Sequence, residues 1–182
     1  MKITDMENVV KLSRTERAQF IYLLKILKNQ GDQDYDYDNL IKALQYGFEL
    51  HYSDVFECLF DEELTSDQCR EVLDILEMYR GIIYSYTNLK REGKQGTLTD
   101  EDVRFKGFDG NNETKQMSYA DYFIKDLDRY SEIEELSRGY YNSHCQMLPR
   151  YRSMLRKWET YQTLPNRYMM NEQQIKDLIK SY

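Results

Sequence analysis

The chain has 182 residues, of which 41% are hydrophobic and 31% are charged, and its net charge is −7. This length allows a substantial buried core, and seventeen tyrosines with seven phenylalanines supply large apolar surfaces, so the composition excludes intrinsic disorder. No apolar run approaches the roughly 18–20 residues of a membrane span, and the N-terminus lacks the apolar core of a secretory signal. The sequence therefore predicts a cytoplasmic protein that does not enter a membrane.

Glycine (8) and proline (2) are scarce, which favours long helices over a fold with many turns. The three cysteines are an odd number with no C-x-x-C pair, which indicates reduced thiols in a cytoplasmic setting.

Charge is unevenly distributed along the chain. Residues 31–77 hold fourteen acidic side chains against two basic ones, whereas residues 138–167 hold six basic side chains against one acidic one. The two regions can attract each other, within a protomer or across a homo-oligomer, or they can be unrelated solvated faces. The sequence leaves both interpretations open.

The first third of the chain predicts short helices after a flexible leader, residues 1–12. The stretch "SRTE" is a capping box for a helix that ends near residues 29–31. Asp38 is the expected N-cap of a second helix, which Gly47 should end or bend. Ser53 is the expected cap of a third, short helix. The apolar stripe of the first helix contains Phe20, Leu23 or Leu24, and Leu27.

A long helix over residues 66–90 is the strongest structural prediction. Thr65 or Ser66 caps it, and Gln68 completes a capping box with Thr65. Its apolar positions cover most of the circumference, which is typical of a central helix that is contacted on several sides. These positions are 72, 75, 76, 79, 82, 83, 86 and 89, and the narrow polar stripe holds Arg70, Asp74, Glu77, Gly81 and Asn88.

The remainder of the chain also predicts helices. Residues 90–96 read as a flexible surface connection, residues 103–105 alternate as a very short strand would, and helical periodicity starts at Asp109. The stretch 131–148 reads as a long tyrosine-anchored loop with room for one helical turn. Pro149 suits the first turn of the next helix, and Asn171 caps the last one. The sequence thus predicts an all-α, multi-helix domain over residues 13–182, packed around the helix 66–90, with at most one very short strand near 103–105.

The stretch "GFDGNNE", residues 107–113, resembles a calcium loop in its spacing of oxygen-bearing side chains. Counted from Asp109, however, the sixth and twelfth positions are Thr114 and Ala120, where such a loop needs glycine and a bidentate glutamate. We therefore expect Asp109, or alternatively Asn111, to be a helix N-cap.

No residues are predicted to be catalytic, cofactor-binding or metal-binding. The spacing of the histidines and cysteines matches no zinc pattern, and adjacent residues such as His144 and Cys145 seldom form the hydrogen bond that nucleophilic catalysis needs. No phosphate-binding loop, dinucleotide fingerprint or nucleophile elbow occurs. The residues considered for a metal were His51, Cys58, Cys69, His144 and Cys145.

The stretch "PRYRSMLRKW" is the candidate nucleic-acid site. Its basic residues alternate with Tyr151 and Trp158, a mixture that contacts phosphates and stacks on bases. Both aromatic residues fall on the apolar face of the predicted helix, however, and a pI near 5.0 is unusual for a dedicated binder. Nucleic-acid binding is therefore possible but not favoured. The candidate residues are Arg150, Arg152, Arg156 and Lys157.

Four fragments in register resemble the YfbU family of bacterial proteins. They are "DILEMY" (74–79), "VRFKGFD" (103–109), the pattern of Tyr141, Asn142, Met147, Tyr151, Met154, Leu155 and Trp158, and "NEQQI" (171–175). The leader before Ser13 and the "EGKQG" connection look longer than the family pattern. The resemblance implies an all-helical, cytoplasmic protein that self-associates and has no known catalytic residues. The candidate family-motif or interface residues are Tyr79, Phe108, Asp109, Asn142, Tyr151 and Trp158.

The tyrosine surplus, the divided charge and this resemblance together favour a non-catalytic homo-oligomer with an interaction or regulatory role. Nucleic-acid binding through residues 150–157 is the alternative, and an enzyme of unknown class ranks third.

Overall fold

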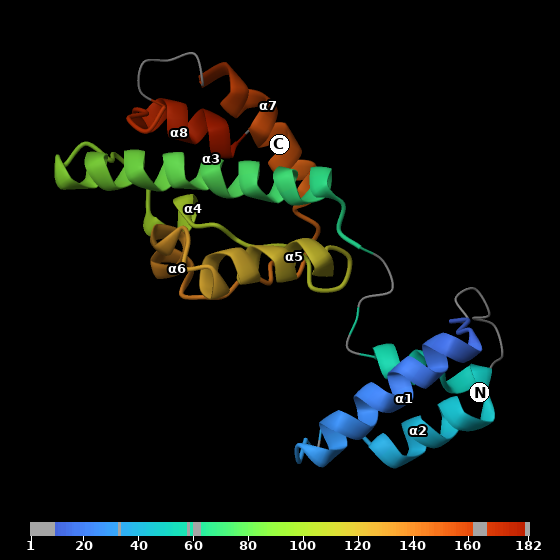
Figure 1. The fold of residues 1–182 in the computed structure, drawn as a ribbon. Helices are drawn as coiled ribbons and strands as arrows, with labels where there is room; N and C mark the ends of the chain where they lie inside the picture. The colour runs from blue at the N-terminus through green and yellow to red at the C-terminus, as the bar shows by residue number, and fades with distance from the viewer. Residues whose placement is uncertain (1–9, 33, 58, 60–62, 162–166, 181–182) are drawn as a thin grey trace. The chain divides into compact units, whose positions relative to one another are not determined.

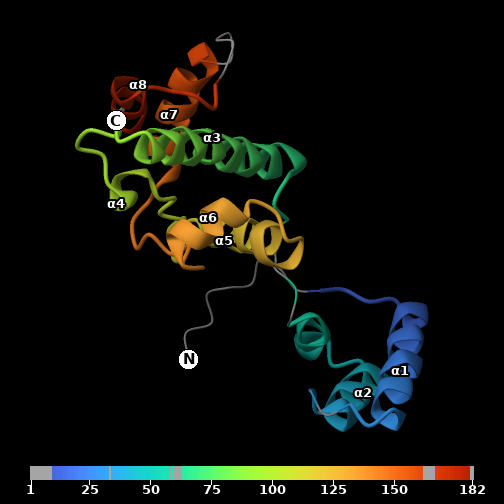
Figure 2. The ribbon, with the colours of Figure 1, turned by 90° about the vertical axis from the view of Figure 1, so that its left-hand side faces the viewer.

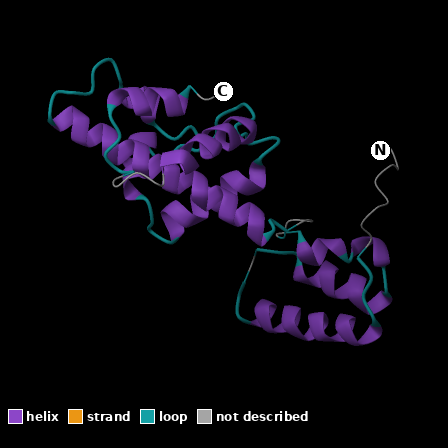
Figure 3. Ribbon diagram, turned by 90° about the horizontal axis from the view of Figure 1, so that it is seen from above, coloured by secondary structure: helices purple, strands orange, loops and turns teal. Residues whose placement is uncertain are grey.

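The computed structural model describes residues 10–32, 34–57, 59, 63–161 and 167–180. It contains two compact units, Met1–Glu63 (the N-terminal unit) and Leu64–Tyr182 (the C-terminal unit). All regular elements within the described residues are helices, as Figure 3 shows, and this confirms the all-α prediction. The boundary between the units falls inside residues 13–182, which the sequence predicts as one domain, and that this segment folds as one domain stays a prediction.

The N-terminal unit is a helical hairpin with two short 3₁₀ turns. Helix α1 (Arg14–Asn29) packs against α2 (Tyr37–Tyr46), and η1 (Glu49–His51) and η2 (Ser53–Phe56) follow. The capping box of Ser13 and Glu16 is present, as predicted. Gly47 ends α2 with a left-handed φ of 77°, a conformation that glycine adopts without a steric penalty. The small core of this unit consists of Leu24, Tyr37, Ile41, Leu44 and Tyr52.

Three predictions for the N-terminal unit need correction or fall outside the described residues. The N-cap of α2 is Asp36 and not Asp38, because the Asp36 carboxylate accepts hydrogen bonds from the backbone and side-chain amides of Asn39. Ser53 begins η2 without capping it through its side chain. Residues 1–9 of the predicted leader are outside the described part, whereas Val10 and Leu12 pack against the small core.

Helix α3 (Ser66–Arg91) organises the C-terminal unit. Thr65 and Gln68 form the predicted capping box, and the eight predicted apolar positions of α3 are buried except Leu89, which is half-buried. In Figures 1 and 2, α7 (Leu148–Tyr161) and α8 (Glu172–Ile179) lie on one side of α3. On the other side lie α4 (Asp100–Val103), α5 (Thr114–Asp121) and α6 (Ser131–Ser137). The prediction of a long central helix is thus confirmed for this unit.

Two segments of the C-terminal unit differ from their predicted structure. The short alternating stretch near 103–105 is not a strand: Val103 is the last residue of α4, whose turn begins with the capping box of Thr99 and Asp102, and Phe105 follows the helix. Val103 and Phe105 are both buried. The predicted loop after Tyr130 contains α6, which is longer than the single expected turn. Between α5 and α6, Tyr122–Asp126 (η3) form a π-helical turn that periodicity did not predict.

Gly81 permits the closest approach of α7 to α3. A Cβ atom on Gly81 would lie 2.3 Å from Cη2 of Trp158, which is closer than any normal carbon–carbon contact. The glycine therefore lies in the predicted polar stripe of α3 because the indole ring needs its space, and it is buried.

Candidate functional site

Asp109, the residue that first suggested an ion-binding loop, is fully engaged within its own turn. Its carboxylate accepts a hydrogen bond from the Asn111 backbone N–H (3.0 Å) and another from the Asn112 side-chain amide (2.5 Å). These bonds lower the pKa of Asp109 below its usual value. The expected N-cap role is wrong for both Asp109 and Asn111, because α5 begins only at Thr114 and its N-cap position is Glu113.

Glu113 carries out a different task that the sequence did not reveal. Its buried carboxylate accepts hydrogen bonds from the backbone N–H groups of Met147 (2.9 Å) and Leu148 (2.8 Å), at the start of α7. It also accepts from the Asp109 N–H at 3.0 Å. The N-terminus of α7 is therefore capped by a residue 34 positions earlier in the chain, where a negative charge is favoured by the helix dipole.

Asn142 connects the same loop to the segment before α7. Its side-chain oxygen accepts from the backbone N–H groups of Gly110 (3.2 Å) and His144 (3.0 Å). Beside it, Phe108 and Asn142 form an isolated parallel bridge. Gly107 has a φ of 79°, and a Cβ there would lie 1.8 Å from the Tyr141 carbonyl oxygen, so only glycine fits. The loop 107–113 is thus a structural junction.

The remaining family-motif candidates lie in the core of the C-terminal unit. Tyr79, Phe108 and Tyr151 pack around Phe105 with ring centroids 5.2–5.8 Å apart, and the Tyr151 hydroxyl donates to the Gly107 carbonyl at 2.8 Å. Burial raises the pKa of Tyr79 to about 12. Trp158 is also buried, against Gly81. The structure therefore brings the six family-motif candidates into or against one core, where their contacts are with the chain itself.

The candidate nucleic-acid segment is only partly available to a ligand. Arg152 forms a two-pronged ion pair with Glu71, at 2.6 and 2.9 Å, and Arg150 donates to the Ile179 carbonyl at 2.9 Å. Arg156 and Lys157 are exposed. The pairing of Arg152 with Glu71 shows that the basic and acidic regions of the sequence do meet within the C-terminal unit.

The residues considered for metal binding or catalysis do not assemble a site within the part of the chain that the structure describes. His144 hydrogen-bonds the Tyr140 hydroxyl at 2.6 Å, whereas the Cys145 thiol points to the sulfur of Met147. His51 pairs with Asp54 at 3.2 Å. No group of three or more potential metal ligands occurs among the described residues, and Cys58 lies outside them.

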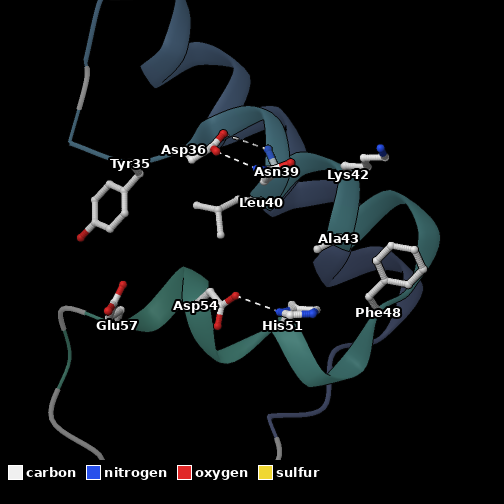
Figure 4. Close-up of a pocket in the computed structure, with 10 residues that line it drawn as sticks. All are labelled: Tyr35, Asp36, Asn39, Leu40, Lys42, Ala43, Phe48, His51, Asp54 and Glu57. Atoms are coloured by element: carbon white, nitrogen blue, oxygen red, sulfur yellow. Dashed lines mark hydrogen bonds and ion pairs between the residues drawn. The ribbon is translucent and has the colours of Figure 1, made fainter.

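The N-terminal unit contains a cavity of about 630 Å³, shown in Figure 4. Tyr35 and Glu57 face each other on one side of the view, while Asp36 bonds Asn39 and Asp54 bonds His51. The described lining contains no serine or cysteine that could act as a nucleophile. Its residues are Tyr35, Asp36, Asn39, Leu40, Lys42, Ala43, Phe48, His51, Asp54 and Glu57.

The same unit displays an unusual helix surface. Leu24 faces the small core, but Tyr22, Leu23 and Ile26 are 67%, 55% and 53% exposed. The predicted apolar stripe of α1 is therefore correct for Phe20 and Leu24, which face the small core. It is wrong for Leu27, which faces outward together with Leu23. We call the exposed side chains of Tyr22, Leu23, Ile26 and Leu27 the outer face of α1.

These features define a helical protein with two cores, no assembled catalytic group among its described residues, and an apolar helix surface. The model of the YfbU domain matches residues 10–181, and the chain belongs to this family. The UPF0304 protein MJECS11 of the archaeon Methanocaldococcus jannaschii is 32% identical over 173 residues, which cover 94% of this chain and 98% of that protein. None of the described helices is both long and apolar enough to cross a membrane.

Proposed function

We propose that the protein self-associates through the outer face of α1 and acts in the cytoplasm as a non-catalytic interaction or regulatory protein. One observation carries the proposal: three large apolar side chains, Tyr22, Leu23 and Ile26, are each more than half exposed along one helix. A surface helix normally presents polar side chains to water, and contiguous apolar patches mark interaction surfaces.

The size of the N-terminal core supports the same proposal. Among the described residues, five hydrophobic side chains form its buried cluster, whereas the C-terminal unit buries a far larger set. Small units bury a small fraction of their apolar surface and are marginal by themselves. Additional burial of the α1 outer face in a complex would stabilise this unit.

The charge of the outer face favours a second copy of the chain as the partner. The four outer-face residues carry no charge, and Thr15, Ala18 and Gln19, one to two turns earlier in α1, are also exposed and uncharged. In a two-fold symmetric interface a residue near the axis meets its own copy, so charges there would repel each other. The absence of charge from the four outer-face side chains is compatible with such an interface, although Glu16 and Lys25 are exposed nearby on the same helix.

Ile26→Glu tests the proposal by introducing a charge in the middle of the outer face. We expect the wild-type chain to elute as a dimer or larger species in size-exclusion chromatography with light scattering, and the variant to elute as a monomer. The matched control is Leu127→Glu, which makes the same change at an exposed leucine of the C-terminal unit. If both variants keep the wild-type mass, the α1 outer face is not the interface.

A further inference from the structure

A second, smaller cavity lies in the C-terminal unit, beside the π-helical turn η3. It has a volume of about 360 Å³, within the range of small-molecule pockets. Its walls come from the end of α5, from η3 and from the segment that leads to α7. The described lining residues are Met117, Ser118, Asp121, Tyr122, Asp126, Tyr140, Tyr141 and Asn142.

The lining combines aromatic rings with negative charge. Tyr122, Tyr140 and Tyr141 present three phenol rings, and Asp121 and Asp126 supply two carboxylates, while the described lining contains no lysine or arginine. The face of an aromatic ring attracts a cation, and a carboxylate adds charge attraction and accepts N–H hydrogen bonds. This set of side chains is suited to a positively charged organic group and would repel an anion.

Tyr141 also has a polar atom that the described residues leave without a partner. The residue is 4% exposed, and its hydroxyl oxygen is buried with no hydrogen-bond partner among the described residues. Leaving a buried hydroxyl unpaired costs free energy, and such groups are rare. Burial, with the nearby charges of Glu134 and Asp121, raises the pKa of this phenol, so it stays neutral.

A lysine of the chain already uses the rim of this site as an ammonium group would. The Lys125 Nζ lies 5.3 Å from the centroid of the Tyr141 ring and 2.5 Å from the Asp121 carboxylate. This geometry shows that one ring and one carboxylate of the lining together hold an ammonium ion. Asp126, in contrast, has no ion pair within the described residues and is exposed.

The N-terminal cavity is a weaker candidate for a cation. It contains Lys42 and His51 in its lining, and Asp54 is already paired with that histidine. No buried, unpartnered side-chain atom occurs among its described lining residues.

We propose that the cavity beside η3 binds a small organic cation, an amine whose ammonium group is held by the tyrosine rings and the Asp126 carboxylate. Primary and quaternary ammonium ions share this chemistry. They differ in whether they donate N–H hydrogen bonds, so the two kinds of probe distinguish them.

Titration calorimetry on the full chain tests the proposal with three probes: spermidine, choline and 3,3-dimethylbutan-1-ol, the uncharged carbon analogue of choline. We expect saturable binding of at least one amine and a loss of about tenfold or more in affinity for the neutral analogue. Stronger binding of spermidine assigns a primary amine, and stronger binding of choline assigns a quaternary one. Equal binding of the neutral analogue, or binding of neither amine at millimolar concentration, would overturn the proposal.

Two variants locate the bound amine. Tyr122→Ala and Asp126→Asn each remove one exposed group of the lining, so the fold should persist, and each should weaken binding by about tenfold. Tyr84→Ala, at a partly exposed tyrosine of α3, and Phe48→Ala, in the N-terminal cavity, are the matched controls and should bind as the wild type does. Undiminished binding by both test variants would show that the amine does not occupy this cavity.

Discussion

At the scale of single residues, Glu113 shows how a buried carboxylate joins distant segments. The negative charge is stabilised by backbone N–H groups from two loops, and α7 lacks a capping side chain of its own. The absence of a serine, threonine, aspartate or asparagine just before Leu148 was the one signal in the sequence that a distant cap was needed. Which residue supplies it depends on tertiary contacts that no local pattern contains.

Replacing Glu113 with glutamine tests this role. The amide keeps the size of the side chain but removes its charge. One acceptor oxygen is replaced by an NH₂ group, which cannot accept a hydrogen bond from the backbone N–H groups that surround it. We expect a loss of about 1–3 kcal/mol in the free energy of unfolding, measured by urea denaturation. Glu135→Gln, at an exposed glutamate of α6, is the control and should change stability little. An equal effect of the two substitutions would contradict the capping role.

Asp109 gives a prediction for acidic pH. Hydrogen bonds from Asn112 and Asn111 lower the pKa of Asp109 in the folded protein, so this group stabilises the fold above the pKa it has when unfolded. The contribution is lost as pH falls below about 4 and through the lowered folded-state pKa. Urea denaturation at pH 6 and at pH 3 should therefore show a smaller acid-induced loss for Asp109→Asn than for the wild type. If the variant and the wild type lost the same free energy of unfolding between pH 6 and pH 3, ionisation of Asp109 would not contribute to the pH dependence of stability.

At the scale of elements, periodicity and capping chemistry predicted most helices. The capping boxes at Ser13, Thr65 and Asn171 are all present, since each depends only on residues three positions apart. Helix α6 and the turn η3 were missed because tertiary packing, not local periodicity, fixes them. Both segments adjoin residues with positive φ, at Asp128, Tyr130 and Arg138, where side chains other than glycine adopt left-handed backbone.

The contact between α3 and α7 yields a prediction at this scale. Alanine is a better helix former than glycine by about 1 kcal/mol, so Gly81→Ala would stabilise an isolated helix. In the folded protein the new methyl group collides with Trp158, and overpacking of this kind costs about 1–3 kcal/mol. We expect net destabilisation in urea, partly relieved when Gly81→Ala is combined with Trp158→Phe. If the effects of Gly81→Ala and Trp158→Phe on the free energy of unfolding simply added in the double variant, the new methyl group would not collide with the indole ring.

The candidate site was predictable only in part. Trp158 and Tyr151 were correctly expected to be core residues, because both fall on the apolar face of α7. The sequence left open that the basic and acidic regions attract each other, but it did not identify the partners of Arg150 and Arg152, since Ile179 and Glu71 lie far away in the sequence. The cavity beside η3 also combines separated segments, and its formation depends on the π-helical turn.

At the scale of the whole molecule, two cores of unequal size share one chain. The larger core surrounds α3 and buries most of the apolar side chains of that helix. In the N-terminal unit, by contrast, the outer face of α1 is not covered by the other residues of the unit. If a second copy of the chain covered this face, apolar side chains would become buried in the N-terminal unit, which has the smaller hydrophobic core. Burial of this face is the physical reason for the proposed homo-oligomer, and the tyrosine-rich composition serves mainly the larger core.

Sedimentation equilibrium of the full-length wild-type chain tests self-association most directly. The mass of the chain is 22.1 kDa. At micromolar concentration and above we predict a weight-average mass that rises with concentration towards at least twice this value, because the α1 outer face becomes buried between copies. A mass that stays at 22.1 kDa over the whole concentration range would contradict the account.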